Sequence, residues 1–502
     1  MNIETKSLLL RDFKASDKSE LSKICSDLKL MKYVFDGPIK VNEFDTFIKK
    51  YFASSGKKIG LGTLCRKDIN EVIGFAGLLP FKGKGKEDGI EFGFVINKPH
   101  WGNGFGTEIG KTLIKYGYET LNHSKLFATV HPENTASIKV LNKLKLVKIY
   151  PNIDIKDRGP RLVYSTITIE SVEDTLKLIC SYSNSDKKSE ELKNRWDQIL
   201  KGDDYKFPFP FGIWFRGHSR SEEYKLLPSI FRQDKDAKKH YRESALFNSF
   251  KLYNPSYNET HKDNLAWLTL MQHYDLPTRL LDWTENILIA LYFAVKDSDS
   301  KTNENEESNG KLYILNSDRL NRITRMSQFE NGLAIPTSIE PLLYSFIVSG
   351  KGKTGLLQQI HNFNLYEKIK IYNSAIIEWL YGGQEVEHKL IEEKMRYAVA
   401  VFPQRINARM QVQQSMFTIH GGKISTSVRE GNQIGTPISL EELNELQGSD
   451  KEFLDYYIIP KEKKNKILNE LKMIGIHQRS LYPDIDKQAE YLKKIWFLKS
   501  NN

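Results

Sequence analysis

The chain of 502 residues is 40% hydrophobic and 27% charged, which excludes a disordered chain and predicts a globular protein of about two to four domains. It has no apolar run of the roughly 18 residues that a membrane helix needs, and its three cysteines are too widely spaced for a disulfide scaffold or a thiolate metal site. With 74 Lys and Arg against 63 Asp and Glu, the net charge of +11 favours polyanionic partners such as nucleic acid or nucleotides, with a solvated basic surface as the alternative.

Short strands and helices alternate from the N-terminus to residue 167, which predicts an α/β domain. The strands are expected at residues 8–13, 71–81, 89–96, 125–130 and 161–169. The helices are expected at residues 16–28, within 101–121 after a glycine-rich turn, and at 133–146.

A second domain, of α+β class, is expected over residues 168–502. It opens with a helix at 171–182 and a polar stretch at 183–195, before the aromatic strand FPFGIWFRG at 209–217. The segment 297–310 is poor in apolar residues and predicts a mobile surface loop. Later elements are expected as strands at 313–317, 397–402 and 416–421 and as amphipathic helices at 464–475 and 486–498.

The turn Trp101-Gly102-Asn103-Gly104-Phe105-Gly106-Thr107 follows a strand and opens a helix. Glycines allow backbone N–H groups to converge on an anion, and the helix N-terminus adds partial positive charge, so a pyrophosphate is the expected ligand. Two glycines close together also make ordinary tight turns. The next unit, KLFATVHPENTASIKVLNKLKL, adds a strand and then a helix that begins with the N-x-x-S motif of Asn134 and Ser137.

Together these two units resemble the GNAT N-acetyltransferase superfamily over residues 5–166, and within it the branch that acetylates the N-terminal amines of ribosomal proteins. The resemblance implies a mixed, twisted sheet with flanking helices, acetyl-CoA as cofactor, and a protein or small-molecule amine as acceptor. It implies that acetyl-CoA lies against the turn, with its pyrophosphate bound by backbone amides. The cofactor-binding residues would then be Trp101, Gly102, Asn103, Gly104, Phe105, Gly106 and Thr107.

Three further residues receive roles from the resemblance. Asn134 would hold the pantetheine arm, with a helix cap as the alternative, and Ser137 would protonate the departing thiolate. Glu91 would take a proton from the attacking amine, because an ammonium cannot attack a thioester. The alternative for Glu91 is a strand carboxylate paired with a nearby lysine.

Two positions depart from the family pattern. Trp101 stands where many members have Gln or Arg, although the ribosomal branch often has an aromatic residue there. Lys145 stands where the helix usually ends at Gly, and a non-glycine residue in the left-handed conformation costs on the order of 1 kcal/mol. This cost does not by itself indicate an inactive enzyme.

Three motifs in the second domain resemble the FRG domain family, and with flanking segments the match extends over about residues 170–497. They are WFRGH (214–218), QHYDLPTRLLDWT (272–284) before a strongly apolar helix, and RMQVQQSMFT (409–418). We expect a pocket in which Arg216 and Arg279 bind phosphates bidentately while His273 and Asp282 position a second group. The alternative is a buried ion pair between Arg279 and Asp282 that orients the loop.

The same motifs are similar to those of distant ADP-ribosyltransferases, with NAD as the implied cofactor. On that basis Arg216-Gly217 binds a phosphate or ribose, Thr284 supports the nicotinamide ribose, and Gln413 or Gln414 takes the place of the usual catalytic Glu. A neutral Gln supplies a dipole rather than a charge. Glu385 and Glu387 could supply the charge, but they precede the expected strand.

Three functional hypotheses follow. The first is a cytoplasmic bifunctional bacterial effector, a toxin or phage-defence protein, whose second domain binds a nucleotide and modifies a macromolecule. Its catalytic residues would be Glu91 and Ser137 in the first domain and Arg216 and Gln414 in the second. In the second hypothesis the FRG domain is a non-catalytic recognition module that selects the acetylation target. In the third, the first domain only senses acetyl-CoA. No metal and no membrane partner is expected in any of them.

Overall fold

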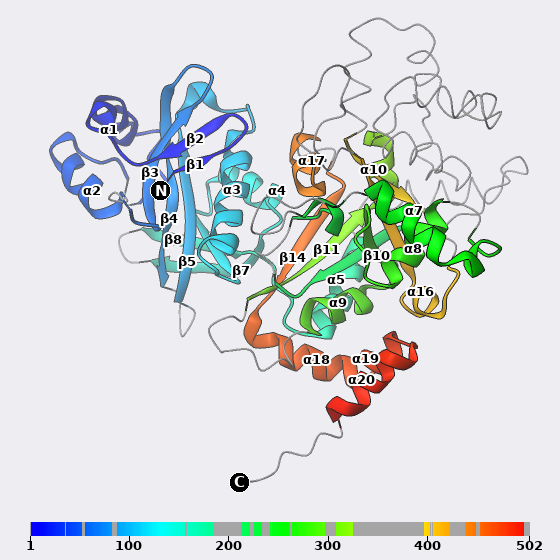
Figure 1. Ribbon diagram of the computed structural model, residues 1–502. Helices are drawn as coiled ribbons and strands as arrows, with labels where there is room; N and C mark the ends of the chain where they lie inside the picture. Colours follow the sequence, from blue (N-terminus) through cyan, green and yellow to red (C-terminus); the bar gives the residue numbers. More distant parts are fainter. Residues whose placement is uncertain are drawn as a thin grey trace, which may run out of the picture. The chain divides into compact units, whose positions relative to one another are not determined.

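The structure of the protein is a computed structural model. It describes residues 2–495 except 36, 53–55, 83–87, 156–157, 185–211, 221–224, 233–240, 242, 262–263, 297–307, 325–395, 402, 404, 422–436 and 448–451. The chain forms two compact units (Figure 1). Unit 1 comprises Met1–Ile169 with Ile458–Lys461, and unit 2 comprises Glu170–Tyr457 with Glu462–Asn502.

Unit 1 is built on one eight-stranded sheet with the order β1-β2-β3-β4-β5-β6-β8-β7. Its strands are β1 (Ile3–Glu4), β2 (Leu8–Arg11), β3 (Gly60–Arg66), β4 (Glu71–Lys82), β5 (Asp88–Ile96), β6 (Leu126–Val130), β7 (Val147–Ile155) and β8 (Gly159–Ser165). Neighbouring strands pair antiparallel except β5 and β6, which are parallel. The sheet is therefore mixed, as the sequence predicts.

The parallel pair β5–β6 is joined over only two residues. Ile90 pairs with Leu126 and Glu91 pairs with Phe127, whereas on its other side β5 pairs with β4 along all nine residues from Asp88 to Ile96. Beyond Glu91 the ladder between the two strands stops. Glu91 therefore lies where the sheet opens between β5 and β6.

The helices of unit 1 lie on both faces of this sheet, α1 and α2 on one and α3 and α4 on the other (Figure 1). The first pair seals a core in which Leu21 and Phe47 pack against Phe75 of β4. The α-helices are α1 (Lys18–Ser26), α2 (Phe44–Tyr51), α3 (Phe105–Glu119) and α4 (Thr135–Lys143), and the 3-10 helices are η1 (Ala15–Asp17), η2 (Val41–Glu43) and η3 (Lys98–His100).

Unit 2 contains a six-stranded sheet with the order β12-β13-β10-β9-β11-β14. Its strands are β9 (Ile213–His218), β10 (Leu280–Thr284), β11 (Gly310–Asn316), β12 (Ala398–Val401), β13 (Ser415–His420) and β14 (Leu454–Ile459). Its helices are α5 (Val172–Asn184), η4 (Ser229–Phe231), α7 (Glu243–Tyr253), η5 (Pro255–Tyr257), α8 (Asn264–His273), α9 (Ile287–Val295), α10 (Ser317–Thr324), α16 (Ala408–Val412), α17 (Leu440–Gln447), η8 (Lys461–Lys463), α18 (Lys464–Met473), α19 (Gln478–Leu481) and α20 (Ile485–Ile495).

Side-chain alternation along the central strands gives unit 2 two apolar clusters. Leu280 and Phe417 pack with α7 and α8, whereas their neighbours Leu281 and Met416 pack with α10 and α17. Because successive residues of a strand point to opposite faces, the sheet buries both of its surfaces. Helix α9, with seven of its nine residues buried, packs against β9.

Close packing of α9 on β9 depends on Gly217. A Cβ atom at this position would lie 1.9 Å from the carbonyl oxygen of Ala290 and 2.5 Å from the amide nitrogen of Ala294. Both distances are far below van der Waals contact, so a side chain would force the helix away from the strand. The glycine of the WFRGH motif is therefore a packing requirement.

Most of the elements expected from the sequence are present, with a few differences. Elements that were not anticipated include β3, α2 and β7 in unit 1 and α7, α8, α10, α17 and β14 in unit 2, and the stretch 280–284 before α9 is a strand rather than a loop. Most of the expected loop at 297–310, the pair Glu385 and Glu387, and the first residues of the strand at 209–217 lie outside the described residues.

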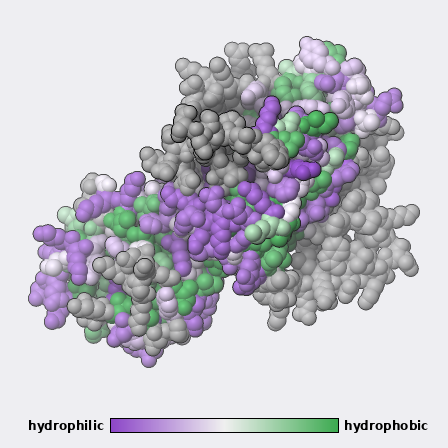
Figure 2. All heavy atoms as spheres, turned by 90° about the horizontal axis from the view of Figure 1, so that it is seen from below, coloured by the Kyte–Doolittle hydropathy of each residue, from purple (hydrophilic) through white to green (hydrophobic). Residues whose placement is uncertain are grey.

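The part of the chain that the structure describes has no helix long and apolar enough to cross a membrane. Figure 2 shows one face of the molecule, on which hydrophilic residues form broad areas and hydrophobic residues form smaller ones between them. Cys25 and Cys65 are buried free thiols, and burial raises the pKa of Cys25 to about 12. The described residues contain no group of three His, Cys, Asp or Glu side chains placed to hold a metal ion.

Candidate functional site

The glycine-rich turn of unit 1 adopts backbone angles that favour glycine. Gly102 and Gly104 have φ of +83° and +80°, and Gly104 is the N-cap of α3. A Cβ atom at either position would meet nothing within 4 Å. These two glycines are therefore explained by backbone conformation rather than by crowding, and the turn faces open space.

The N-terminus of α3 offers the donors that an anion needs. The first hydrogen bonds within the helix come from the N–H groups of Thr107 and Glu108, both to the carbonyl of Gly104. The N–H groups of Phe105 and Gly106 precede these bonds and lie at the positive end of the helix dipole. An open turn with outward amides fits a pyrophosphate, as the sequence predicts.

Trp101 lies at the entrance to this turn. Its side chain is 53% exposed, and its indole N–H donates to the carbonyl of Ile96 over 2.6 Å. Asn103 donates from its amide to the carbonyl of His100 over 3.1 Å. Both side chains therefore bond to the backbone on the N-terminal side of α3, and this fixes the shape of the turn.

The N-x-x-S motif forms a helix cap. The Asn134 side chain accepts from the N–H of Ser137 over 3.1 Å, which is the capping role that the sequence analysis kept as an alternative. Ser137 is half-buried on the first turn of α4. At the other end of α4, Lys145 has φ of +60°, the left-handed conformation expected there, and Leu146 donates back to Leu141.

The Glu91 carboxylate is 6% exposed and bonds through both of its oxygens. Oε1 forms an ion pair with Arg158, and Oε2 accepts from the hydroxyl of Thr129 over 3.0 Å. The alternative of a paired carboxylate therefore has structural support, with an arginine in place of the expected lysine. The pairing does not remove Glu91 from the place where β5 and β6 separate.

A second arginine organises the chain beside this carboxylate. Buried Arg161 donates to the carbonyls of Tyr33 over 2.8 Å and Phe35 over 3.0 Å, and Arg158 lies over the Phe35 ring. The sequence analysis did not identify these residues. No local motif marks them, because contacts that span more than 120 residues bring them together.

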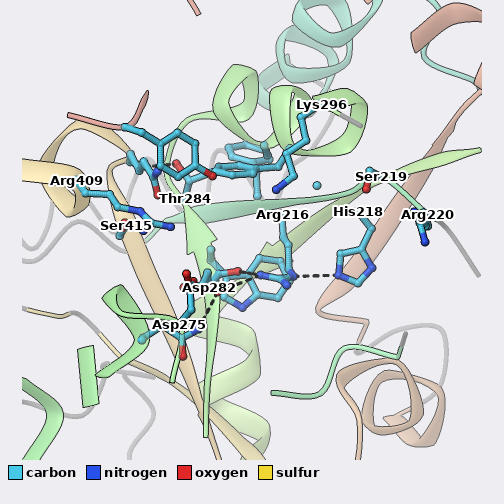
Figure 3. A pocket seen from close by; sticks show the side chains of 18 of the residues that line it. Arg216, His218, Ser219, Arg220, Asp275, Asp282, Thr284, Lys296, Arg409 and Ser415 are labelled. Carbon is cyan, nitrogen blue, oxygen red and sulfur yellow. Dashed lines mark hydrogen bonds and ion pairs between the residues drawn. The ribbon is translucent and has the colours of Figure 1, made fainter. Parts of the chain in front are cut away.

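Unit 2 has a cavity of about 450 Å³ at one end of β9 and β10 (Figure 3). That volume is within the range of small-ligand sites. The lining residues come from β9, η4, α8, β10, α9, α16, β13 and α19 and their adjoining turns: Phe215, Arg216, Gly217, His218, Ser219, Arg220, Arg232, Gln272, Asp275, Asp282, Trp283, Thr284, Ala290, Phe293, Lys296, Arg409, Gln413, Ser415 and Tyr482.

Arg216 lies near the middle of this cavity, between Asp282 and His218 (Figure 3). Its Nη1 donates to the carbonyl of Asp282 over 2.5 Å and lies 3.7 Å from the carboxylate of the same residue. Its Nε donates to Nε2 of His218 over 3.2 Å. Burial, followed by Arg216, Arg232 and Lys311, holds the pKa of His218 well below its usual value, so His218 is a neutral acceptor at neutral pH.

Arg279 does not line the cavity. It is 1% exposed, its Nε donates to Glu243 over 2.6 Å, and its Nη1 donates to the carbonyl of His420 over 2.6 Å. This corrects two expectations, that Arg279 binds phosphate beside Arg216 and that it pairs with Asp282. Its partner is Glu243, 36 residues earlier in the chain, and the buried pair fastens α7 to the start of β10.

His273 and Gln414 also lie outside the cavity lining. His273 has its Nε2 3.4 Å from Asp484, and burial lowers its pKa although Asp484 opposes this. Gln414 adopts a φ of +48°, and its carbonyl accepts from the N–H of Glu285. These positions correct the expectation that the two side chains face the same pocket as Arg216.

Gln413 and Thr284 line the cavity and also make structural bonds. Thr284 donates its hydroxyl to the carbonyl of Gln413 over 2.7 Å and accepts from the N–H of Asn286, the N-cap of α9. The amide of Gln413 donates to the carbonyl of Leu481 over 3.0 Å. The structure thus brings together Arg216, Gly217, Asp282, Thr284 and Gln413 of the predicted pocket.

The charges around the cavity are unbalanced. Two carboxylates line it, Asp275 and Asp282, against five basic side chains: Arg216, Arg220, Arg232, Lys296 and Arg409. Since His218 is neutral, the lining has a clear excess of positive charge, which attracts an anion. Of the five, only Arg216 was expected to bind phosphate from the sequence, although Arg409 begins the motif RMQVQQSMFT; the fold brings all five together from separate segments.

Comparisons with known proteins match the two units to different families. Residues 7–147 match the acetyltransferase (GNAT) domain, and residues 212–303 match the FRG domain. The chain is 34% identical over 147 residues to the uncharacterised N-acetyltransferase p20 of Bacillus licheniformis and 28% identical over 144 residues to the uncharacterised N-acetyltransferase YnaD of Bacillus subtilis (strain 168). Each match covers 29% of this chain and 81% of the relative.

A comparison with solved structures found the following similarity. A GNAT-family acetyltransferase from Bacillus anthracis is 24% identical, with a TM-score of 0.29, over 33% of this chain and 98% of the other.

Proposed function

Because its first unit makes this chain a member of the GNAT family of N-acetyltransferases, followed by an FRG domain, we propose that unit 1 transfers an acetyl group from acetyl-CoA to an amine. Members of the GNAT family use acetyl-CoA. The observation that carries the proposal is the pairing of an open glycine turn at α3 with a buried carboxylate where β5 and β6 separate.

Glu91 lies on β5, and the glycine turn follows the same strand. A Cβ atom at Gly106 would lie 3.1 Å from the Phe94 ring, so the start of α3 packs over β5. Phe94 follows Glu91 by three residues, which is ~10 Å of strand, and this odd spacing places the two side chains on opposite faces of the sheet. The separation of β5 and β6 beyond Glu91 would let an extended cofactor pass between these faces. The amides of Phe105 and Gly106 would receive the pyrophosphate, so the acyl end of an extended cofactor has a route toward Glu91.

Acetyl-CoA supplies an acetyl group activated as a thioester. In the proposed mechanism Glu91 accepts a proton from the incoming amine, and Ser137 gives a proton to the thiolate that leaves. Asn134 caps α4 and so fixes the position of Ser137. Since Oε1 of Glu91 pairs with Arg158, the incoming ammonium must replace this guanidinium before the proton moves.

We propose as acceptor a protein or small-molecule amine, with the N-terminal amine of a ribosomal protein as the finer candidate. An ammonium would meet the carboxylate of Glu91 beside the aromatic ring of Phe35, because Arg158 contacts both the carboxylate and that ring. Cationic amines favour such an aromatic and acidic environment.

The test of this proposal is Glu91→Gln in the full chain, with acetyl-CoA turnover measured on a panel of amines and N-terminal peptides. We expect a loss of kcat of about 10²- to 10⁴-fold with acetyl-CoA binding retained, because the amide cannot accept the proton. Glu20→Gln on the exposed face of α1 is the matched control and should keep full activity. Unchanged turnover in Glu91→Gln would favour the alternative that unit 1 only senses acetyl-CoA.

For unit 2 we propose ADP-ribosyl transfer from NAD to a macromolecule, which would make the protein a bifunctional bacterial effector, a toxin or phage-defence protein. The C1′–nitrogen bond to nicotinamide breaks with its electron pair, and a nucleophile of the target bonds to C1′ and releases its proton to solvent. Arg216 and Thr284 line one cationic cavity, which favours this proposal over a recognition module that only directs acetylation.

Labelled NAD tests the transfer. The wild-type chain, incubated with cellular protein, RNA and DNA, should transfer label, and Arg216→Ala should not. If neither chain transfers label, the recognition module becomes the better account, and it predicts that cavity variants change which amine is acetylated.

A further inference from the structure

We propose that the cavity of unit 2 is a binding site for a nucleoside diphosphate group, with the phosphates on Arg216, Arg220 and Arg232 and the base at Phe293 and Tyr482. The site deepens the proposed nucleotide-dependent role of unit 2 and rests on it, but it does not require that ADP-ribose is transferred. A free nucleoside diphosphate and NAD share this chemistry.

The first argument is the arrangement of charge. His218, Ser219 and Arg220 lie at one end of the cavity, Arg409 and Thr284 lie at the other, and Arg216 lies between them (Figure 3). Burial lowers the pKa of Arg216, and Asp282 opposes this effect while Arg232 adds to it. An anion between the guanidinium groups of Arg216 and Arg232 would relieve their repulsion.

The second argument is the way in which Arg216 is held. Its Nε bonds to His218 and its Nη1 to the carbonyl of Asp282, and neither bond uses Nη2. Because His218 is neutral, it orients the guanidinium without adding charge. A fixed planar donor of this kind matches the paired oxygens of a phosphate.

The third argument is the aromatic end of the cavity. Phe293 and Tyr482 meet edge to face with ring centroids 6.4 Å apart, and both rings are half-buried. Lys296 lies 5.3 Å from the Phe293 centroid, and Arg409 lies 4.8 Å from that of Tyr482. Rings and a guanidinium plane are the groups on which bases stack.

The size of the cavity limits the ligand. About 450 Å³ suits a single nucleotide, and the charge excess matches the two or three negative charges of a diphosphate. A nucleic acid would also be attracted by the basic lining, but the limited volume and the aromatic end favour the small ligand.

The test is calorimetric titration of the full chain with ADP, NAD, pyrophosphate and adenosine at fixed ionic strength. ADP or NAD should bind at least tenfold more tightly than adenosine and than pyrophosphate. Arg216→Gln and Arg220→Gln should each weaken binding at least tenfold, and Tyr482→Leu should weaken ADP but not pyrophosphate. Arg479→Gln, exposed on α19 outside the cavity lining, removes the same charge and should change nothing.

Because CoA carries an ADP moiety, ADP can also enter unit 1, so each variant is titrated with CoA as well. Loss of one equivalent of ADP in Arg216→Gln with CoA binding retained assigns the site to unit 2. If Arg216→Gln does not fold, Arg220→Gln gives the same comparison. Equal affinity for ADP and adenosine, or no change in the variants, would overturn the proposal. If ADP binds but no label is transferred from NAD, the proposal of ADP-ribosyl transfer is overturned, and the proposed nucleoside diphosphate site is retained.

Discussion

Two arginines of similar sequence context have opposite environments in unit 2. Arg216 follows a buried strand segment and lines the cavity, whereas Arg279 precedes a buried strand and pairs with Glu243 inside the fold. The Glu243 carboxylate and a backbone carbonyl satisfy the buried guanidinium of Arg279, so its environment depends on where Glu243 lies. Since 36 residues separate Arg279 from Glu243, no local pattern could tell these two arginines apart.

His420 makes the stability of unit 2 depend on pH. Its ring is fully buried, and burial, followed by Arg279, Arg216 and Arg232, lowers its pKa to about 3. Trp283 donates to the hydroxyl of Thr418, so this hydroxyl has its own hydrogen available for Nε2 of His420. That bond requires a neutral ring.

We therefore expect unit 2 to lose stability as the pH falls. Below about pH 6.5 the unfolded chain binds a proton at His420 that the native chain excludes until about pH 3, so the free energy of unfolding decreases over this window by up to about 1.4 kcal/mol per pH unit. Above pH 6.5 this histidine does not change the free energy of unfolding with pH, because it is neutral in both the folded and the unfolded chain. Urea unfolding of unit 2 between pH 4 and pH 6 should show a shallower slope in His420→Gln than in the wild type. An identical slope in the two chains would contradict the assignment.

At the scale of elements, glycines serve two different purposes. Gly102 and Gly104 adopt positive φ in open space, and Gly217 permits contact between β9 and α9. The sequence patterns G-x-G and R-G predict a permissive backbone in both places. Only the packing reveals which glycine lacks room for a side chain.

Gly217→Ala should destabilise unit 2 by about 3 kcal/mol or more, because the new methyl group would overlap the backbone of α9 at Ala290 and Ala294. Chemical unfolding followed by tryptophan fluorescence measures the loss, since Trp214, Trp267 and Trp283 are buried in unit 2. Gly93→Ala in β5 is the control, because its Cβ would meet nothing within 4 Å and little change is expected. Equal stabilities of the two variants would contradict the packing account.

Two strands that were not anticipated, β3 and β7, share a physical cause. β3 is buried along almost its whole length, so it has no alternation of polar and apolar residues, and it contains two glycines. β7 has a proline at position 151 and two register shifts against β8, which break the period of two. Strands of this kind form because their neighbours supply the pairing, and their own sequences carry a weak signal.

At the scale of the whole molecule, each unit contains its own sheet and its own candidate site. We expect the two sites to respond separately. Glu91→Gln should abolish acetyl transfer and leave the affinity for ADP unchanged. Arg216→Gln should weaken ADP binding and leave acetyl transfer unchanged. Measuring both quantities in both variants and in the double variant checks this. An effect of Arg216→Gln on acetyl transfer beyond about twofold would indicate coupling between the units.

The sequence by itself determined the succession of an acetyltransferase domain and an FRG domain, the glycine turn, the capped helix that carries Ser137, and the left-handed Lys145. These features depend on residues adjacent in the chain, whose backbone preferences and hydrogen bonds are local. The tertiary structure alone decided that Arg158 pairs with Glu91, that Arg279 pairs with Glu243, and which basic side chains surround Arg216. Two charged side chains form an ion pair when the fold brings distant segments together and removes the water between them. The spacing of residues in a single sequence does not show which segments will come together.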